Sequence, residues 1–185
     1  MLKKITLVLV FLGVNTGLYA GGNDYDTSES STPFIGLELG GTFVQGDTNG
    51  TKSGEPNHKG SGASFGLRFG AQNAQWRSMV IFDYFHSKKD DQKYERALIQ
   101  VDYFVMPDTF AGTSFKPYVG INGGYVSYES TNIPNANGFT YGGQLGVVMA
   151  LSNHIDVDLA YRYNMAQPTA LDNIGSVVLG VNYIY

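Results

Sequence analysis

The sequence of 185 residues contains no cysteine, which excludes disulfide bridges and thiolate metal sites. Charged residues are scarce, at 15%, and the 16 acidic residues outnumber the 12 basic ones. That balance argues against nucleic acid as a partner. Mean hydropathy is close to zero, at −0.13, so no average over the chain would mark it as a membrane protein. Glycine and tyrosine, by contrast, are frequent, with 24 and 13 residues.

The one sustained apolar run lies near the start, in residues 5–14, after Lys3 and Lys4. Small residues follow it as far as Ala20. The run is too short to span a bilayer as a helix. A basic segment, an apolar segment and small residues in this order indicate a secretory signal peptide, residues 1–20, and therefore export. Residues 21–33 are polar and rich in Ser, Thr, Asp and Gly, which predicts a flexible leader before the first strand.

From Phe34 onward the sequence alternates with a period of two, the pattern of β-strands with two different faces. The last fifteen residues show it clearly. Val177, Leu179, Val181, Tyr183 and Tyr185 share one face, and smaller or more polar residues share the other. An aromatic strand of this kind would be a sticky edge in a soluble protein. It fits a closed membrane barrel, in which it pairs with the first strand and its aromatics lie at the lipid–water boundary.

Eight such alternating segments are present, so the predicted fold is an all-β, eight-stranded antiparallel up-and-down transmembrane barrel over residues 34–185. Taking the longer connections as extracellular places residues 46–62, 86–92, 130–137 and 166–170 outside. Both ends of the barrel domain are then periplasmic, with Tyr183 and Tyr185 as periplasmic aromatic anchors.

The distribution of charge is the strongest argument for a barrel. All four arginines lie on the small or polar face of their strands, together with five carboxylates. This predicted lumen charge network comprises Glu38, Arg68, Arg77, Asp83, Arg96, Asp102, Asp156, Asp158 and Arg162. An Arg or Lys facing lipid at the midplane costs about 2–4 kcal/mol, so a barrel keeps such residues inside. A soluble sandwich would face its charges outward.

Two stretches, KPYVGINGGY at residues 116–125 and HIDVDLAYRY at residues 154–163, resemble strands of the small OmpA-like and OmpX-like outer-membrane barrels. The resemblance covers the chain from Phe34 to Tyr185. It implies a bacterial outer-membrane location, lipopolysaccharide in the surrounding outer leaflet, a monomer, and insertion machinery that reads the terminal strand. No cofactor is implied. Larger members carry a peptidoglycan-binding domain after the barrel, a role not expected here.

The function we expect is structural or surface-interactive, with a lumen plugged by paired charges and outer loops available for adhesion. A passive narrow channel for small solutes or apolar molecules is the first alternative. A lipid hydrolase is a more distant one, because its only candidate pair, His86 and Ser87, consists of neighbours that point to opposite faces of a strand. Three histidines on separate segments are also poor evidence for a metal site.

The charges also predict a register for the third and fourth strands. If paired residue numbers sum to 179, Asp83 stands opposite Arg96 and Arg77 opposite Asp102, all facing the lumen. A shift by one residue would turn these charges toward lipid.

Overall fold

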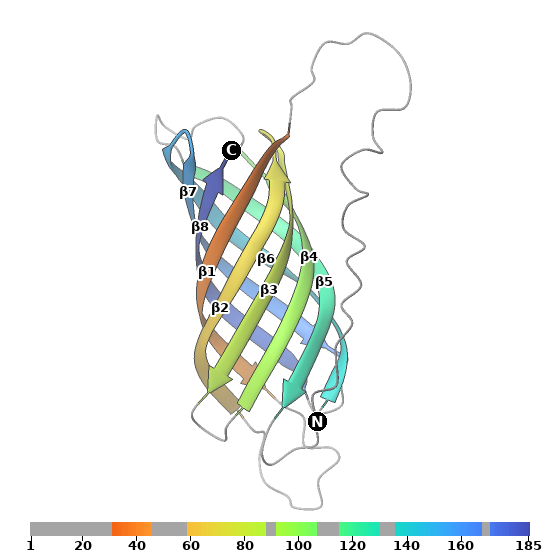
Figure 1. Cartoon of the computed structure of the whole chain (residues 1–185). Coiled ribbons are helices and arrows are strands. Elements are labelled where there is room, and N and C mark those ends of the chain that lie inside the picture. Colours follow the sequence, from red (N-terminus) through yellow and green to blue (C-terminus); the bar gives the residue numbers. More distant parts are fainter. Residues whose placement is uncertain (1–30, 46–58, 88–91, 107–114, 130–135, 168–170) are drawn as a thin grey trace, which may run out of the picture.

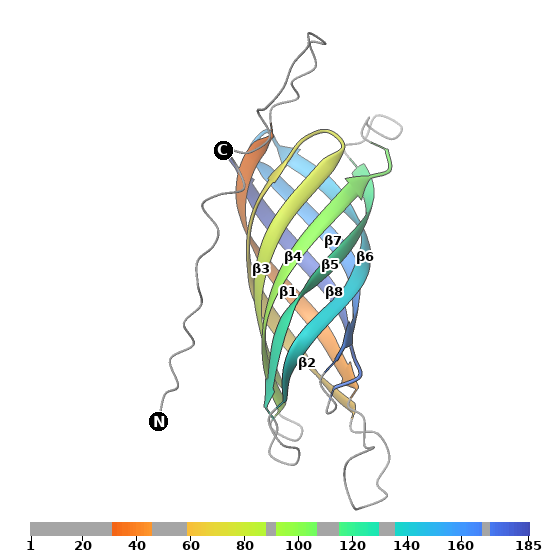
Figure 2. The same cartoon turned by 90° about the vertical axis from the view of Figure 1, so that its right-hand side faces the viewer.

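The computed structural model describes residues 31–45, 59–87, 92–106, 115–129, 136–167 and 171–185. These residues form eight antiparallel strands that close into a barrel, each strand pairing with its neighbours in the chain and β1 pairing with β8 (Figures 1 and 2). The strands are β1 (Thr32–Gln45), β2 (Lys59–Gln72), β3 (Trp76–Ser87), β4 (Gln92–Phe104), β5 (Phe115–Glu129), β6 (Ala136–Ser152), β7 (Ile155–Ala166) and β8 (Asn173–Ile184). The predicted fold is confirmed. No helix in the described ranges is long and apolar enough to cross a membrane.

Closure rests on the pairing of β1 with β8, in which Leu37 faces Val181 and Thr42 faces Ser176. Beyond the ladder, the backbone N–H of Tyr185 donates to the carbonyl of Pro33 at 3.1 Å. The strand edges at both ends of the barrel domain are thereby paired. A bilayer offers no water to satisfy free backbone groups, so a spanning sheet has to close in this way.

The two ends of the barrel differ. The β2–β3 and β6–β7 connections are tight turns at the end where β1 begins and β8 ends; in Figure 1 the C-terminus lies beside the β6–β7 hairpin. In the first of them Asn73 accepts hydrogen bonds through Oδ1 from the backbone N–H groups of Gln75 and Trp76, at 2.9 and 2.7 Å. An Asn side chain commonly closes a turn in this way. We call this the turn end, and the opposite one the loop end.

Side chains alternate between lumen and exterior along every strand. On β8 the outward residues Val177, Leu179, Val181 and Tyr183 are 46–49% exposed, while Val178 and Asn182 between them are buried. Outward-facing charges such as Glu95 and Glu129 occur at the loop end of β4 and β5. The exterior is therefore an apolar band with polar residues beyond it, the surface of a barrel that lies in a bilayer.

The strands extend further than the sequence indicated. Expected loops at residues 46–62 and 130–137 give way to strand from Lys59 and Ala136, and β3 and β4 include Ser87 and Gln92. Polar composition suggested loops there, but backbone pairing does not require apolar side chains, so the ladders continue. The turn between β6 and β7 falls at Asn153 and His154, and the register is irregular between Ala150 and Ser152. The expected signal peptide lies outside the described residues.

Changing both Tyr183 and Tyr185 to Asp should prevent assembly, because both side chains are exposed on the outer face of the closing strand, at 49% and 69%. Aromatic side chains are favoured at the membrane–water boundary, whereas a carboxylate at these two positions would place a charge against lipid. The measurement is the amount of heat-modifiable barrel in isolated outer membranes, from boiled and unboiled samples on a gel. The matched control is Tyr→Phe at both positions, which keeps the rings. Wild-type amounts of heat-modifiable Asp variant would contradict the prediction.

Candidate functional site

The lumen is the candidate site, because it gathers buried charges from all over the chain. Four arginines and four carboxylates form one continuous series of ion pairs that alternates in sign. The series runs Asp102–Arg77–Asp158–Arg68–Glu38–Arg162–Asp83–Arg96. It uses residues of β1, β2, β3, β4 and β7, so it ties strands across the barrel to one another. Its formal charges sum to zero.

Arg68 stands near the middle of this series. Its Nε donates to Glu38 Oε2 at 2.7 Å, and its Nη1 donates to Asp158 Oδ2 at 2.8 Å. Asp158 also accepts from Arg77 Nη1 at 2.9 Å, and Glu38 accepts from both Nη atoms of Arg162, at 2.9 and 3.0 Å. Each of these two carboxylates therefore bridges two guanidinium groups. Charges this deeply buried are tolerated only when they are paired and hydrogen-bonded in such a way.

The register of β3 and β4 is the one that the sequence predicted: Arg77 pairs with Asp102 and Asp83 with Arg96. Arg77 Nη2 lies 2.8 Å from Asp102 Oδ2, and Arg96 Nη2 lies 2.5 Å from Asp83 Oδ2. Arg162 Nη1, on β7, is 3.8 Å from the same oxygen of Asp83, and this contact links the Asp83–Arg96 pair to the rest of the series.

Neutral polar residues complete the site, and the charge pattern alone did not point to them. Gln100 and Gln144 donate through Nε2 to Asp102 Oδ1, each at 3.0 Å, at one end of the series. At the other end Arg96 donates to Asn164 Oδ1 at 3.1 Å. These residues could have been found from the alternating sequence, because each occupies a lumen-facing position of its strand. Asp156, expected in the network, also faces the lumen, but it accepts from Gln72 Nε2 at 2.8 Å and stands outside the series of ion pairs.

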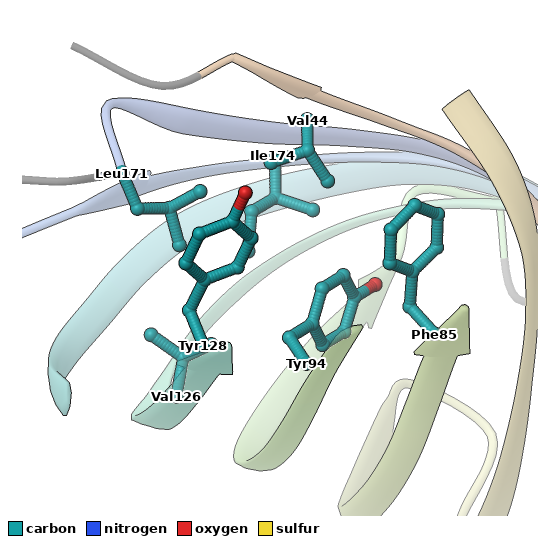
Figure 3. Close-up of a cluster of buried hydrophobic side chains, with 7 residues drawn as sticks. All are labelled: Val44, Phe85, Tyr94, Val126, Tyr128, Leu171 and Ile174. Atoms are coloured by element: carbon teal, nitrogen blue, oxygen red, sulfur yellow. The ribbon is translucent and has the colours of Figure 1, made fainter. Parts of the chain in front are cut away.

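Buried apolar side chains lie at the loop end of the charged series and beside its ion pairs. The loop-end layer is a cluster of seven buried side chains, shown in Figure 3: Val44, Phe85, Tyr94, Val126, Tyr128, Leu171 and Ile174. Within it the rings of Phe85 and Tyr94 stack at 4.9 Å. Two smaller clusters pack beside the ion pairs. In the first, which also contains Phe34, the residues Met79, Ile81 and Leu98 lie along β3 and β4 between the Arg77–Asp102 and Asp83–Arg96 pairs. The second consists of Phe104, Tyr118, Val148 and Ala160, and its rings lie near Arg77. The sequence interpretation, which expected polar contents, missed these apolar clusters.

Aromatic rings join these clusters to the ion pairs. The guanidinium carbon of Arg96 lies 5.3 Å from the ring centre of Tyr94, and that of Arg77 lies 4.6 Å from the ring centre of Tyr118. Cations over aromatic faces gain more when water is excluded. The lumen thus has an apolar layer at the loop end, and in the remainder ion pairs and apolar clusters pack against each other.

The residues of the hydrolase alternative are far from a catalytic arrangement. His86 is exposed on the exterior, whereas Ser87 is buried and donates through Oγ to the carbonyl of Ser61 at 2.9 Å. His154 lies at the turn end, where it stacks on Tyr183 at 6.1 Å. The third histidine, His58, lies outside the described residues. In the described ranges no three His, Cys, Asp or Glu side chains are grouped so that they could hold a metal ion.

No protein-family model matches the chain, and no curated protein sequence matches it either. Solved structures do match. Neisserial surface protein A superimposes with a TM-score of 0.66 at 17% identity, covering 85% of this chain and 100% of that one. Outer membrane protein H of Pseudomonas aeruginosa gives 0.56 at 20% identity, with 83% and 99% covered. Outer membrane protein OprG of the same organism gives 0.52 at 16% identity, with 85% and 97% covered.

The fold is that of a small outer-membrane β-barrel. The apolar exterior agrees with it, because a closed barrel with this surface is stable only in lipid. Fold and exterior together indicate a barrel that lies in a membrane, as in the outer-membrane barrels that it resembles in fold.

Removing one charge of the Asp83–Arg96 pair should destabilise the barrel, and the two single changes should differ. Asp83→Ala leaves Arg96 with only the neutral Asn164 as a hydrogen-bond acceptor, whereas Arg96→Ala leaves Asp83 near Arg162. Breaking a buried pair costs about 3–5 kcal/mol, so we expect Asp83→Ala to reach this range and Arg96→Ala to cost less. The double variant should cost clearly less than the sum. Urea unfolding from liposomes measures all three; additive losses would refute the coupling.

A second prediction tests whether the network has spare room. A Cβ on Gly180 would overlap the Arg68 guanidinium and the Asp158 carboxylate, whereas a Cβ on Gly41, on the exterior, would meet nothing within 4 Å. Gly180→Ala should therefore lower the free energy of unfolding by roughly 1–3 kcal/mol, as overpacking does. Gly41→Ala, the matched control, should leave it nearly unchanged. Equal effects of the two changes in the same liposome assay would show that the ion pairs can shift at no cost.

Proposed function

We propose that the protein is a closed, non-conducting barrel whose role is structural: it stabilises the outer membrane and presents its outer loops at the cell surface. The observation that carries this proposal is the content of the lumen. The series of eight alternating charges fills the middle, the loop-end layer lies over it, and two smaller apolar clusters pack beside its ion pairs. A hydrated ion would have to displace the apolar side chains and then separate pairs that are 0–4% exposed.

The narrow-channel alternative requires a continuous polar path, and the stacked aromatic rings of Phe85 and Tyr94 oppose one. Eight strands enclose a space that side chains are able to fill, which is consistent with a plugged lumen. The proposal extends to the surroundings. We infer a monomer in contact with lipopolysaccharide in the outer leaflet, assembled by insertion machinery that reads β8. The apolar exterior supports the contact with lipid.

The proposal predicts that the purified protein is silent in planar bilayers. The measurement is single-channel current at fixed voltage, with a known general porin in the same bilayer as the positive control. The ion pairs block the lumen independently of the loop-end layer. The double variant Phe85→Gly, Tyr94→Gly, which removes the stacked rings of that layer, should therefore also be silent. Discrete, reproducible openings of the wild-type barrel would overturn the proposal. Openings of the double variant alone would show that the apolar layer is the sole barrier.

A further inference from the structure

A pocket of about 240 Å³ lies in the mouth of the lumen at the turn end, and we call it the turn-end pocket. Asn73 and Asn153, from the two tight turns, stand at its rim. None of the eight charged residues in the series of ion pairs lines it. Pockets for drug-sized ligands commonly measure about 300–1,000 Å³, so this one suits a smaller molecule.

Two side chains of opposite charge line this pocket, and in the described part of the chain neither has an ionic partner. Asp156 is 5% exposed, and the hydrogen bond that it accepts comes from a neutral donor, Gln72 Nε2, at 2.8 Å. Lys116 is half-buried, and its Nζ lies 5.9 Å from the ring centre of Phe104. No ion pair joins Lys116 to a carboxylate of the described residues, Asp156 included.

The strand β6 keeps these two charges apart. Lys116 on β5 pairs with Val148 of β6, whereas Asp156 on β7 pairs with Ala150 of β6. Neighbouring strands lie about 4.8 Å apart, so the backbones of β5 and β7 are separated by roughly 10 Å. The carboxylate that stands in the same row as Lys116 is Asp158, and two arginines of the series already hold it. The pocket therefore presents a cation and an anion that do not neutralise each other.

We propose that the turn-end pocket binds a small zwitterion of the α-amino-acid class, with its ammonium group at Asp156 and its carboxylate at Lys116. A buried carboxylate with only a neutral donor is costly, and a bound ammonium group removes that cost. An ion of one sign would satisfy one of the two side chains and meet a like charge at the other, whereas a zwitterion satisfies both. Phe104, Val148 and Ile184 supply an apolar wall, which suits an amino acid with an apolar side chain.

This inference goes beyond the proposed structural role, because it assigns a ligand to one end of the lumen. It does not depend on whether the middle of the lumen conducts. In the orientation that the sequence analysis expects, the turn end faces the periplasm, so a water-soluble ligand reaches the pocket without crossing the barrel.

Chemical-shift mapping with three matched probes is the test. L-Leucine carries both charges, isoamylamine is the same skeleton without the carboxylate, and isocaproate is the same skeleton without the ammonium group. Each is titrated into the isotope-labelled full barrel in lipid nanodiscs while the backbone amide signals are recorded. We expect leucine to cause saturable shifts around Val148 and Asp156 and none around Tyr128 in the loop-end layer. Both single-charge probes should bind several-fold more weakly.

Two substitutions that keep side-chain size assign each charge to its partner. Asp156→Asn should weaken leucine binding several-fold and abolish the preference for leucine over isocaproate, which lacks the ammonium group. Lys116→Gln should weaken leucine binding as well and abolish the preference over isoamylamine, which lacks the carboxylate. The matched control is Glu95→Gln, at an exposed carboxylate on the exterior near the loop end, and it should change neither preference. Heat-modifiability on a gel checks that each variant folds.

Equal binding of the three probes to the wild-type barrel would overturn the proposal, and this comparison needs no substitution. A direct pair between Lys116 and Asp156 in the membrane would overturn it too: leucine would then cause no shift, and Asp156→Asn alone would move the side-chain signal of Lys116. These outcomes leave the proposed function intact, since its test is the bilayer current. Conversely, a barrel that conducts and still binds leucine at the turn end would refute the closed lumen and support the pocket.

Discussion

Charge cannot be left unpaired inside an eight-stranded barrel, and this constraint organises the protein. The lumen is too narrow for bulk water, so each guanidinium needs a carboxylate and each carboxylate needs donors. The alternating series from Asp102 to Arg96 meets this need with zero net charge. Because consecutive members of the series come from different strands, the ion pairs also fix how these strands are aligned with one another along the barrel axis. Ion pairs rarely add much stability, but here a slipped register would break several of them at once.

The same constraint explains why apolar side chains pack against the ion pairs. An ion pair is strengthened when water is excluded. The apolar side chains of the loop-end layer and of the clusters beside the ion pairs exclude it, and Tyr94 and Tyr118 do so while placing their ring faces against Arg96 and Arg77. The apolar side chains and the ion pairs therefore depend on each other. A barrel with the ion pairs alone would hydrate its arginines, and one with the apolar clusters but a broken series would hold an unpaired buried charge.

Alternation and charge sorting were enough to predict the fold, the two faces of each strand and the register of β3 with β4. These features follow from local rules: period two separates the faces, and lipid rejects charge from one of them. The order of the series was out of reach, because Asp158 meets Arg68 and Arg77 only after the sheet has closed. Asp156 shows that residue type and strand face alone do not predict which carboxylates join the series of ion pairs. It has the same residue type and the same face as Asp158, two positions away, yet its height in the barrel gives it Gln72 instead of an arginine.

Glycine makes room for neighbouring side chains on both surfaces of this sheet. In the lumen, Gly180 leaves room for the Arg68 guanidinium and the Asp158 carboxylate, so the missing side chain is replaced by the protein's own atoms. On the exterior, Gly175 stands between Phe43 and Tyr163, and the hydroxyl of Tyr161 lies 3.3 Å from the position that its Cβ would occupy. Gly175 is buried, so the space left by its missing side chain is covered by aromatic side chains of the protein itself. On both surfaces, therefore, the place of the missing side chain is taken by neighbouring atoms, as close packing requires.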